Sequence, residues 1–535
     1  MRHDVDLAIV GSGFAGSILA MVARRLGRSV VLLERGTHPR FAIGESSTPL
    51  ASLLLEEIAR RYDLPRLLPL TKHGTWTRTY PDLACGLKRG FSFFRHVRGR
   101  PFTSDGAHRD QLLVAASPND DVGDVHWYRS DLDHFLVREA VALGVTYVDQ
   151  VSLTRLDTSA GGSELEGARR PGAGGDAAEP VQVSARFVVD ATGPRGFLHQ
   201  HLQLGERPLA GMPRTQALFS HFTGVRPFAD VASAAFDARP PYPVDAAAVH
   251  HVFDGGWVWV LRFDNGVTSA GVAATDPLAD ELGLQDGAAA WSRLLARFPS
   301  IGAQFASAAP TRAFTWWPRL AFQSDTIVGD GWAMLPSAAG LVDPLLSTGF
   351  PLTLLGIERL AAAIADDWGT PRFAPRLARY AERTAGELHT TARLVGALYD
   401  AFGDWERFTA LSHLYFAAAS FGEAARRLGT SASATDGFLL SGCAPFAAAR
   451  DRCLDLAAEA RGGSGRSSCA REALLAEIAR AVEPVNVAGL LQPARRHWYP
   501  CEAADLLAGA GKLGASEGEI TAMLARCGFT PRQGR

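Results

Sequence analysis

The apolar and polar positions near the N-terminus follow the pattern of a strand, a helix and a second strand. Residues 6–10 (DLAIV) form a short apolar run, which predicts a buried parallel strand. A glycine-rich turn at 11–16 follows, and helical apolar spacing then continues to the residue before Gly27. The apolar run at 29–34 predicts the next strand. The pattern therefore indicates a parallel α/β unit with its glycines at the first turn.

Later segments extend this sheet. The runs at 187–193 (FVVDATG) and 326–334 each predict a strand, and residues 351–368 predict a long helix. Helical spacing of apolar residues predicts another helix over 130–144. Residues 159–180 are rich in Gly, Ala and charged side chains, and this composition predicts a hairpin loop outside the sheet.

Strand patterns also fill residues 209–319, which predicts an antiparallel sheet inserted into the parallel fold. Within it, the run at 257–261 places Trp257, Trp259 and Leu261 on one face, because strand side chains alternate. Two indoles there form a large flat wall, and each indole N–H needs a partner. A lone WxW is more often a half-buried strand. From residue 371 the chain is Ala- and Arg-rich and helical.

Composition excludes several classes of protein. The chain has 535 residues, 47% of them hydrophobic, and a net charge of −2, which fits a globular protein with no basic surface for nucleic acid. No apolar stretch is long enough to span a bilayer, and the N-terminus does not resemble a signal peptide. The six cysteines form no CxxC pair, so no metal site is predicted. We expect a cytoplasmic protein with reduced thiols.

The glycine turn has the spacing of a dinucleotide-binding site. Gly11 permits the tight turn, Gly13 lets the backbone approach a pyrophosphate, and Gly16 lets the helix pack on the strand. Glu34 ends the second strand, where an acidic side chain can hold the ribose hydroxyls. The motif alone does not distinguish FAD from NAD.

A second candidate site lies at the start of the predicted helix 351–368. Pro351 is favoured in a first helical turn because its missing N–H would be unpaired there. The backbone N–H groups of Ser347, Thr348 and Gly349 would point at whatever lies before the helix, and such a site favours an anion. A plain helix cap is the more common interpretation of this pattern.

The run at 86–94 (GLKRGFSFF) predicts one strand that carries a lysine among small residues. Lys88 shares its predicted face with Gly86, Gly90 and Ser92, which leaves space around the ammonium. By base rate, a lysine in this position faces solvent. Lys72 is a competing candidate, with no distinctive surroundings.

Several of these segments together resemble the flavin-dependent halogenases. The matching runs are W-V-W at 257–259, D-A-T-G at 190–193, the strap-like G-E-S-S-T-P at 44–49, C-G-L-K-R-G-F-S-F at 85–93 and S-T-G at 347–349. The lysine run is most similar to the phenol-type members, such as the pyoluteorin-pathway enzyme that acts on a free phenol. The resemblance covers residues 1 to about 420.

Four positions depart from the family pattern. Leu261 and Arg262 replace the Ile and Pro that follow the tryptophans, and Arg262 lies on the opposite face of the strand. Leu346 stands where tryptophan-specific members carry a catalytic Glu, which argues against tryptophan as the substrate. Ser337 replaces the Asp that binds the ribityl chain in many FAD enzymes, which implies weaker flavin binding.

The resemblance implies an α/β fold with an FAD-binding Rossmann-like domain of the p-hydroxybenzoate-hydroxylase type. We expect this module to span residues 1–370, with antiparallel-sheet substrate-domain insertions at about 63–150 and 209–320, and a helical C-terminal region at 371–535.

The resemblance also implies roles for individual residues. Lys88 would be catalytic, Trp257 and Trp259 would form a barrier between flavin and substrate, and halide would bind at Ser347, Thr348 and Gly349. The expected FAD-binding residues are Gly11, Gly13, Phe14, Ala15, Gly16, Glu34, Arg35, Gly44, Glu45, Ser46, Ser47, Thr48, Arg129, Asp190, Ala191, Gly193, Asp343 and Gly349, with Asp133 beside Arg129.

The implied activity is halogenation of an electron-rich phenol in natural-product biosynthesis. Reduced FAD, supplied by a separate NAD(P)H-dependent flavin reductase, and O2 would convert chloride or bromide into hypohalous acid, which reaches Lys88. The phenol would arrive free or on a carrier protein, and the enzyme would be a monomer or homodimer without nucleic-acid or membrane partners. One alternative is an aromatic hydroxylase of the same fold, and another is a degenerate flavin-binding scaffold.

Overall fold

The protein is built around two large sheets, as the computed structural model shows for residues 1–170, 178–232, 239–429, 437–462 and 468–529. The first sheet has the strand order β18-β19-β10-β1-β2-β7, where β7 is Thr146–Val148, with β8 and β9 beside it. Its centre is β1 (Arg2–Val10), which pairs in parallel with β2 (Val30–Leu33) and β10 (Glu179–Asp190). Helix α1 (Phe14–Arg25) connects β1 to β2, so the predicted β–α–β unit is confirmed.

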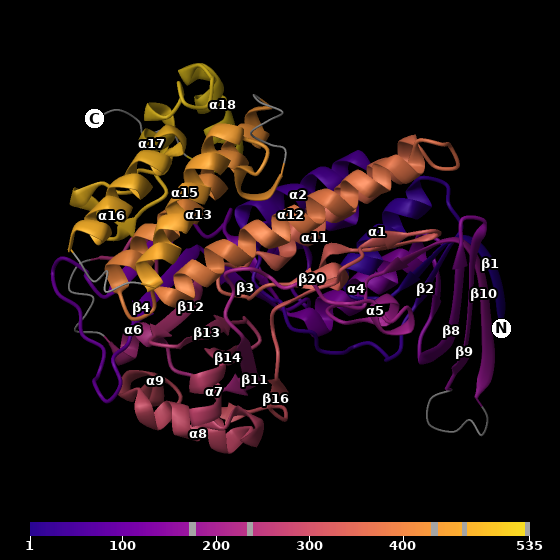
Figure 1. Cartoon of the computed structure of the whole chain (residues 1–535), viewed down its shortest axis with the longest axis horizontal. Coiled ribbons are helices and arrows are strands. Elements are labelled where there is room, and N and C mark those ends of the chain that lie inside the picture. Colours follow the sequence, from indigo (N-terminus) through magenta and orange to yellow (C-terminus); the bar gives the residue numbers. More distant parts are fainter. Residues whose placement is uncertain (171–177, 233–238, 430–436, 463–467, 530–535) are drawn as a thin grey trace.

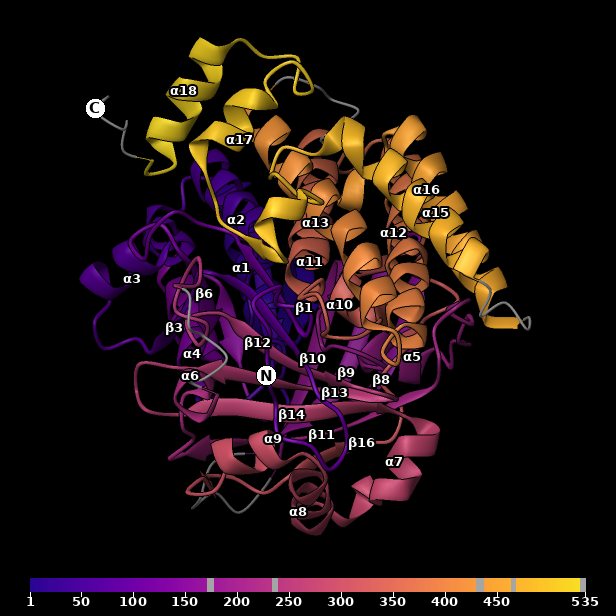
Figure 2. The ribbon, with the colours of Figure 1, turned by 90° about the vertical axis from the view of Figure 1, so that its left-hand side faces the viewer.

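The second sheet is mostly antiparallel and has the order β15-β11-β14-β13-β12-β4-β5-β21. In Figure 2 the helices of the C-terminal half lie above this sheet, and α7 to α9 lie below it. The tryptophan strand is β13, and its two faces enter different cores, with Trp257 on one side and Val258 on the other. The strands are β4 (Gly90–Arg95), β5 (Gln111–Ala115), β11 (Thr215–Thr223), β12 (Ala248–Phe253), β13 (Gly256–Arg262), β14 (Thr268–Thr275), β15 (Ala309–Pro310) and β16 (Thr315–Trp317), and the helices below are α7 (Asp276–Leu282), α8 (Ala288–Arg297) and α9 (Pro299–Gln304).

The C-terminal region is helical, as the sequence predicts, and it also joins the second sheet. Residues Trp498–Tyr499 form the short strand β21, which pairs in parallel with β5. The boundary expected at about residue 370 remains a prediction. The helices of this half are α11 (Gly349–Asp366), α12 (Phe373–Asp400), α13 (Trp405–Leu428), α15 (Ala444–Gly462), α16 (Ser468–Val482), α17 (Ala503–Ala508) and α18 (Glu517–Arg526).

The predicted strand 86–94 is wrong as a single element. The chain forms β3 (Cys85–Lys88), changes sheet at Arg89, and continues as β4. Strand β3 pairs with β6 (Asp124–Trp127), whereas β4 pairs with β5 and β12. This change of sheet alters which side chains share a face, and it brings the ring of Phe91 to 3.9 Å from the Lys88 Nζ.

The expected loop at 159–180 is partly wrong as well. Residues Gly162–Arg169 form β9, which pairs with both β8 (Val151–Ser159) and β10. Ser163 and Leu165 alternate as buried positions of this strand, and the Gly-rich composition around them hides that pattern. Residues 171–177 of the predicted loop lie outside the described part of the chain. The predicted strand 326–334 is instead a tight hairpin, β18 (Val328–Gly329) and β19 (Trp332–Met334).

Candidate active site

A large cavity opens beside the glycine turn, between the two sheets. Its volume is about 340 Å³, and its lining includes Gly13, the strap residues Gly44 and Glu45, and Asp343. Gly11 adopts a φ of +99°, and a Cβ there would lie 2.7 Å from the carbonyl carbon of Ala191, so only glycine fits. The described residues thus provide the turn and the space that a dinucleotide requires.

The strap is the segment of residues 39–49 that passes over this cavity. Arg129, the first residue of α4 (Arg129–Ala142), holds it by donating hydrogen bonds to the carbonyl oxygens of Ile43 and Gly44 at 3.2 and 2.9 Å. The guanidinium is itself fixed by two 2.8 Å hydrogen bonds to Asp133. A bidentate pair of this kind sets the orientation of the guanidinium as well as its position, so the strap has a rigid support.

Glu34 lies directly after β2, where a ribose-binding acid is expected. Its carboxylate accepts hydrogen bonds from the backbone N–H groups of Ser12 and Gly36 and pairs with Arg40 at 2.9 Å. Burial opposes ionisation, but the Arg40 charge and these hydrogen bonds prevail and lower the pKa of Glu34 to about 2. Glu34 is therefore an anion that can accept hydroxyl hydrogen bonds, although Arg40 and Ser12 already use part of this capacity.

The tryptophan wall borders the same cavity. Trp257, Trp259 and Leu261 all line it, and the two indole ring centroids are 5.7 Å apart. The shared face predicted for these three residues is confirmed. Arg262 projects to the other side and donates to the carbonyl oxygen of Val225 at 2.9 Å.

Each indole N–H has a buried partner. Trp257 donates to the hydroxyl of Tyr399 at 3.1 Å, and this hydroxyl donates to a carboxylate oxygen of Asp343 at 2.8 Å. Trp259 donates to the hydroxyl of Ser269 at 3.3 Å. Burial raises the pKa of Asp343 to about 7, and the hydrogen bond from Tyr399 limits that rise. The network connects the wall on β13 to α12 and to the segment before α11.

The start of α11 forms the second expected part of the site. Apart from its chain neighbours and its own helix backbone, a Cβ on Gly349 would meet no atom of the described chain within 4 Å, so its backbone borders open space of the cavity. The N–H of Ser347, in contrast, donates to the carbonyl oxygen of Pro344 at 3.0 Å and is used inside a turn. The expectation that all three amides face an anion is therefore wrong for Ser347, and only Thr348 and Gly349 remain candidates.

Lys88 is fully buried, although its residue type alone predicts a solvent-facing side chain. Its Nζ donates to the hydroxyl of Ser46 at 2.9 Å, to the carbonyl oxygen of Ser47 at 2.6 Å and to the hydroxyl of Ser347 at 3.4 Å. Burial lowers the pKa of the ammonium, and the charge of Asp124 opposes this effect. Such an amine can give up and take back a proton near neutral pH.

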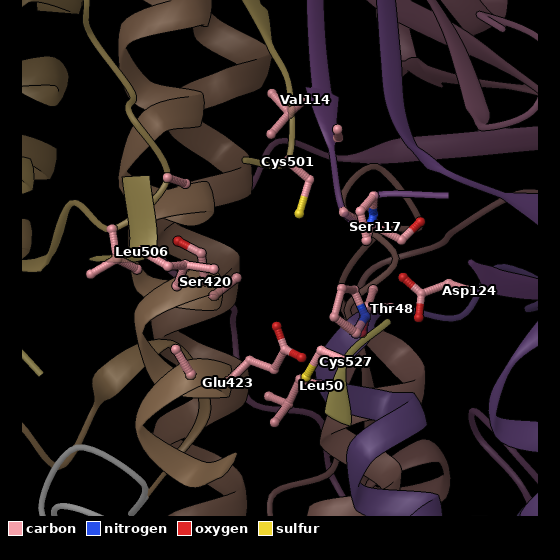
Figure 3. A pocket seen from close by; sticks show the side chains of 18 of the residues that line it. Thr48, Leu50, Val114, Ser117, Asp124, Ser420, Glu423, Cys501, Leu506 and Cys527 are labelled. Atoms are coloured by element: carbon pink, nitrogen blue, oxygen red, sulfur yellow. The ribbon is translucent and has the colours of Figure 1, made fainter. Parts of the chain in front are cut away.

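A second cavity, of about 170 Å³, is bordered by the end of the strap, where Figure 3 shows Thr48 among its lining residues. We call this cavity the ring pocket, because the aromatic rings of Phe91, Tyr415 and Phe416 line it. Its lining combines residues of the strap and α2 (Pro49–Arg61), of β4 to β6, of α13 and of the C-terminal region. Representative lining residues are Thr48, Leu50, Phe91, Val114, Ser117, Asp124, Tyr415, Phe416, Glu423, Val487, Cys501, Leu524 and Cys527.

Lys88 lies between the two cavities. Ser46 and Ser347, which bind its ammonium, line the large cavity. Phe91, whose ring faces the ammonium, and Asp124, its partner across the β3–β6 pair, line the ring pocket. A group transferred by Lys88 would therefore have a compartment on each side.

Family comparisons identify this arrangement. A model of NAD(P)-binding Rossmann-like domains matches residues 9–49. The tryptophan halogenase model matches residues 125–406, just over half of the chain. The chain belongs to this family. It is therefore a flavin-dependent halogenase that uses FAD and halide, and it needs a supply of reduced flavin.

Individual relatives come from antibiotic pathways. The halogenase is 31% identical to the monodechloroaminopyrrolnitrin halogenase PrnC of Pseudomonas fluorescens, over 77% of this chain and 71% of the relative. It is 28% identical to the tetracycline 7-halogenase of Kitasatospora aureofaciens, over 78% and 74%. The structure of halogenase PltM in complex with phloroglucinol and FAD superposes with a TM-score of 0.79 at 24% identity, over 92% of this chain and 99% of the other, which shows a shared fold.

The large cavity brings together most residues expected to bind FAD. The members that line it are Gly13, Phe14, Ala15, Gly44, Glu45, Ser46, Arg129, Ala191, Gly193, Asp343 and Gly349. Thr48 lines the ring pocket instead, and the Arg35 side chain is exposed. The Asp190 carboxylate binds the backbone N–H groups of Thr192 and Leu198 and so shapes the strand end. One buried oxygen of Glu45 has no hydrogen-bond partner among the described residues, which suits a cavity that takes a polar cofactor.

Sequence reasoning missed Tyr399, Asp124 and the ring pocket. Tyr399 lies within the span of the family resemblance, yet its role as the partner of Trp257 depends on the packing of α12 against β13. All six cysteines are free. Among the described residues, no group of three or more His, Cys, Asp or Glu side chains could hold a metal, and no helix is long and apolar enough to cross a membrane.

Replacing Tyr399 with phenylalanine should destabilise the halogenase. The variant leaves the buried indole N–H of Trp257 and a carboxyl oxygen of Asp343 without their partner, at a cost of about 3 kcal/mol. Urea unfolding followed by fluorescence measures this change. Tyr62→Phe is the matched control, because the buried Tyr62 hydroxyl has no hydrogen-bond partner among the described residues. Equal stability of the two variants would contradict the importance of the network.

Proposed function

We propose that this halogenase adds chlorine or bromine to a free, electron-rich phenol with a single aromatic ring. The observation that supports this proposal is the position of Lys88, whose contact residues line the larger cavity beside the glycine turn on one side and a smaller, largely apolar pocket on the other. A reactive halogen species formed in the first compartment would meet Lys88 before it meets an organic substrate in the second.

The size of the ring pocket supports a small aromatic substrate. An engineered apolar cavity of about 150 Å³ is enough for benzene, and the ring pocket measures about 170 Å³. Phe91, Phe416 and Tyr415 provide aromatic surface on one side of it. A second ring or an extended chain would require the surrounding helices to move apart.

When FAD is bound in its reduced form, it would activate O2 and so provide the oxidant that turns halide into hypohalous acid. The side chains have separate roles. Thr348 and Gly349 would hold the halide with their backbone N–H groups at the start of α11. Trp257 and Trp259 would keep the organic substrate away from the flavin side, so that halogen transfer replaces hydroxylation. Lys88 would orient hypohalous acid by a hydrogen bond, or carry the halogen as a haloamine.

The choice of substrate also rests on the residue before Ser347. Leu346 is fully buried and offers only its carbonyl oxygen, which accepts a hydrogen bond from Tyr415 at 2.8 Å. An indole ring needs an acidic partner there, as the family resemblance implies, whereas a phenol activates its own ring through oxygen. PltM, whose structure with phloroglucinol has the same fold, supports a phenolic substrate. PrnC and the tetracycline 7-halogenase are named for other substrates, monodechloroaminopyrrolnitrin and tetracycline.

A panel of small phenols tests this proposal. The enzyme is incubated with FAD, a separate NADH-dependent flavin reductase, NADH, bromide and one phenol at a time, and products are read by the bromine isotope doublet in mass spectrometry. We expect one or two bromine atoms on resorcinol- and phloroglucinol-like rings. Tryptophan and a pyrrole bound to a carrier protein serve as matched alternatives, and bromination of either in place of every phenol would reject the proposal.

A further inference from the structure

The geometry points to Asp124 as the group that accepts the phenol proton during halogen transfer. This inference rests on the proposed function, because it requires a substrate that carries an acidic O–H. Asp124 begins β6 and lies directly across the β3–β6 pair from Lys88, so the two side chains belong to neighbouring positions of one small sheet.

Asp124 has one carboxylate oxygen available. Its Oδ1 accepts a hydrogen bond from the hydroxyl of Ser52 at 3.0 Å. Its Oδ2 is buried and has no hydrogen-bond partner among the described residues. The residue as a whole is 5% exposed and lines the ring pocket, where Figure 3 shows its side chain. A buried acceptor without a partner costs free energy unless a ligand satisfies it.

Ser117 adds a second observation. Its hydroxyl oxygen is also buried, lines the ring pocket and has no hydrogen-bond partner in the described part of the chain. The pocket therefore presents two unsatisfied polar atoms within largely apolar walls. This pattern fits a ring with polar substituents, because apolar walls bind the ring and a few placed polar groups fix its orientation.

The charged and titratable groups around Asp124 are compatible with its role as the acceptor of the phenol proton. Burial raises the pKa of its carboxyl, while Lys88 on β3 lowers it; on α13, Glu423 raises it and Arg427 lowers it. Glu423 itself is paired with Arg427 at 2.5 Å and is thus the less available acceptor. Tyr415 also faces Asp124, and its hydroxyl is occupied by the carbonyl oxygen of Leu346.

The step balances with the hypohalous acid that the halogenase produces. As the ring carbon bonds to halogen and the oxygen–halogen bond breaks, the phenol proton moves to Asp124 Oδ2, and the released hydroxide takes a proton from the Lys88 ammonium to become water. The ring C–H proton then passes to the Lys88 amine, and Asp124 returns its proton to the ring oxygen. The ring loses two electrons to the halogen, and both side chains regain their starting states.

The test compares Asp124→Asn with the natural enzyme on phenols of graded acidity. Asn keeps the size of the side chain but takes no proton, and positioned bases contribute about 10²–10⁴-fold to rate. We expect kcat to fall about 100-fold at pH 7 on a weakly acidic phenol, with KM changed less than about threefold. The loss should shrink towards zero for phenols already ionised at the assay pH, and raising the pH towards the pKa of the phenol should restore the variant.

The controls separate a base from a structural support. Asp110→Asn makes the same change at a carboxylate outside both cavities, where Asp110 pairs with Arg95 at 3.2 Å, and it should stay within about twofold of the natural enzyme. If Asp124 only holds Lys88 in place, Asp124→Asn loses the same factor on every phenol and at every pH, and that result would overturn the inference while leaving the proposed function intact. If the natural enzyme halogenates none of the phenols, both proposals fail together.

Discussion

Replacing Lys88 with alanine is expected to stop halogenation while FAD binding and consumption of reduced flavin continue. The ammonium is fully buried and is held by Ser46, Ser47 and Ser347, so no other side chain can take its place between the two cavities. Loss of a positioned proton-transfer group alone costs about 10²–10⁴-fold, and loss of the halogen carrier adds to it. Product formation should therefore fall by about 10³-fold or more.

Three variants control this prediction. Lys88→Met fills nearly the same volume without a charge, so it should be equally inactive if the amine is what matters. Lys72→Ala tests the competing lysine, which lies at the edge of the ring pocket, and Lys512→Ala removes an ion pair with Glu483 at 2.9 Å in the C-terminal region. Both should keep most of the activity. Normal product yield from Lys88→Ala would refute the assignment.

The second large effect is expected at Gly349. A methyl group there enters open space of the cavity, because it meets no atom within 4 Å other than those of its chain neighbours and its own helix backbone. Gly349→Ala should therefore be about as stable as the natural protein. The same methyl group occupies the space beside the amides that we propose for halide binding.

We therefore expect Gly349→Ala to raise the halide concentration needed for half-maximal rate by about tenfold, which corresponds to about 1.4 kcal/mol. Halide titrations at saturating phenol measure this change, and thermal unfolding measures stability. Gly386→Ala, which also meets no neighbour within 4 Å but lies on α12 away from the cavity, is the matched control. Unchanged halide dependence in Gly349→Ala would place the halide elsewhere.

Local patterns in the sequence predict the elements of this fold well. The glycine turn, the strand with Trp257 and Trp259, and the helix after Gly349 each depend on residues close together in the chain, and each is found where expected. The predicted strand through Lys88 fails because its second half pairs with different partners from its first. Strand pairing is a long-range property that periodicity does not report.

The sequence predicts the kind of site and several of its residues, but not how those residues are arranged in space. Family resemblance pointed to Lys88, yet its burial depends on the strap, on Ser347 and on β6, which lie far apart in the chain. The sequence around Asp124 does not indicate a functional residue, because its neighbours have the pattern of an ordinary short strand. The ring pocket requires residues from as far apart as Thr48 and Cys527, so only the folded chain reveals it.

We infer that halogen passes from the flavin side to the ring pocket through Lys88 without leaving the protein. Bromination of phloroglucinol tests this path when it is run with and without a scavenger that removes free hypobromous acid from solution. The quantity measured is the brominated phloroglucinol formed per NADH consumed. We predict the same yield in both reactions, because the transfer occurs between two internal cavities. If the scavenger abolishes the product, the halogen travels through solvent, and the account of Lys88 as the internal link is contradicted.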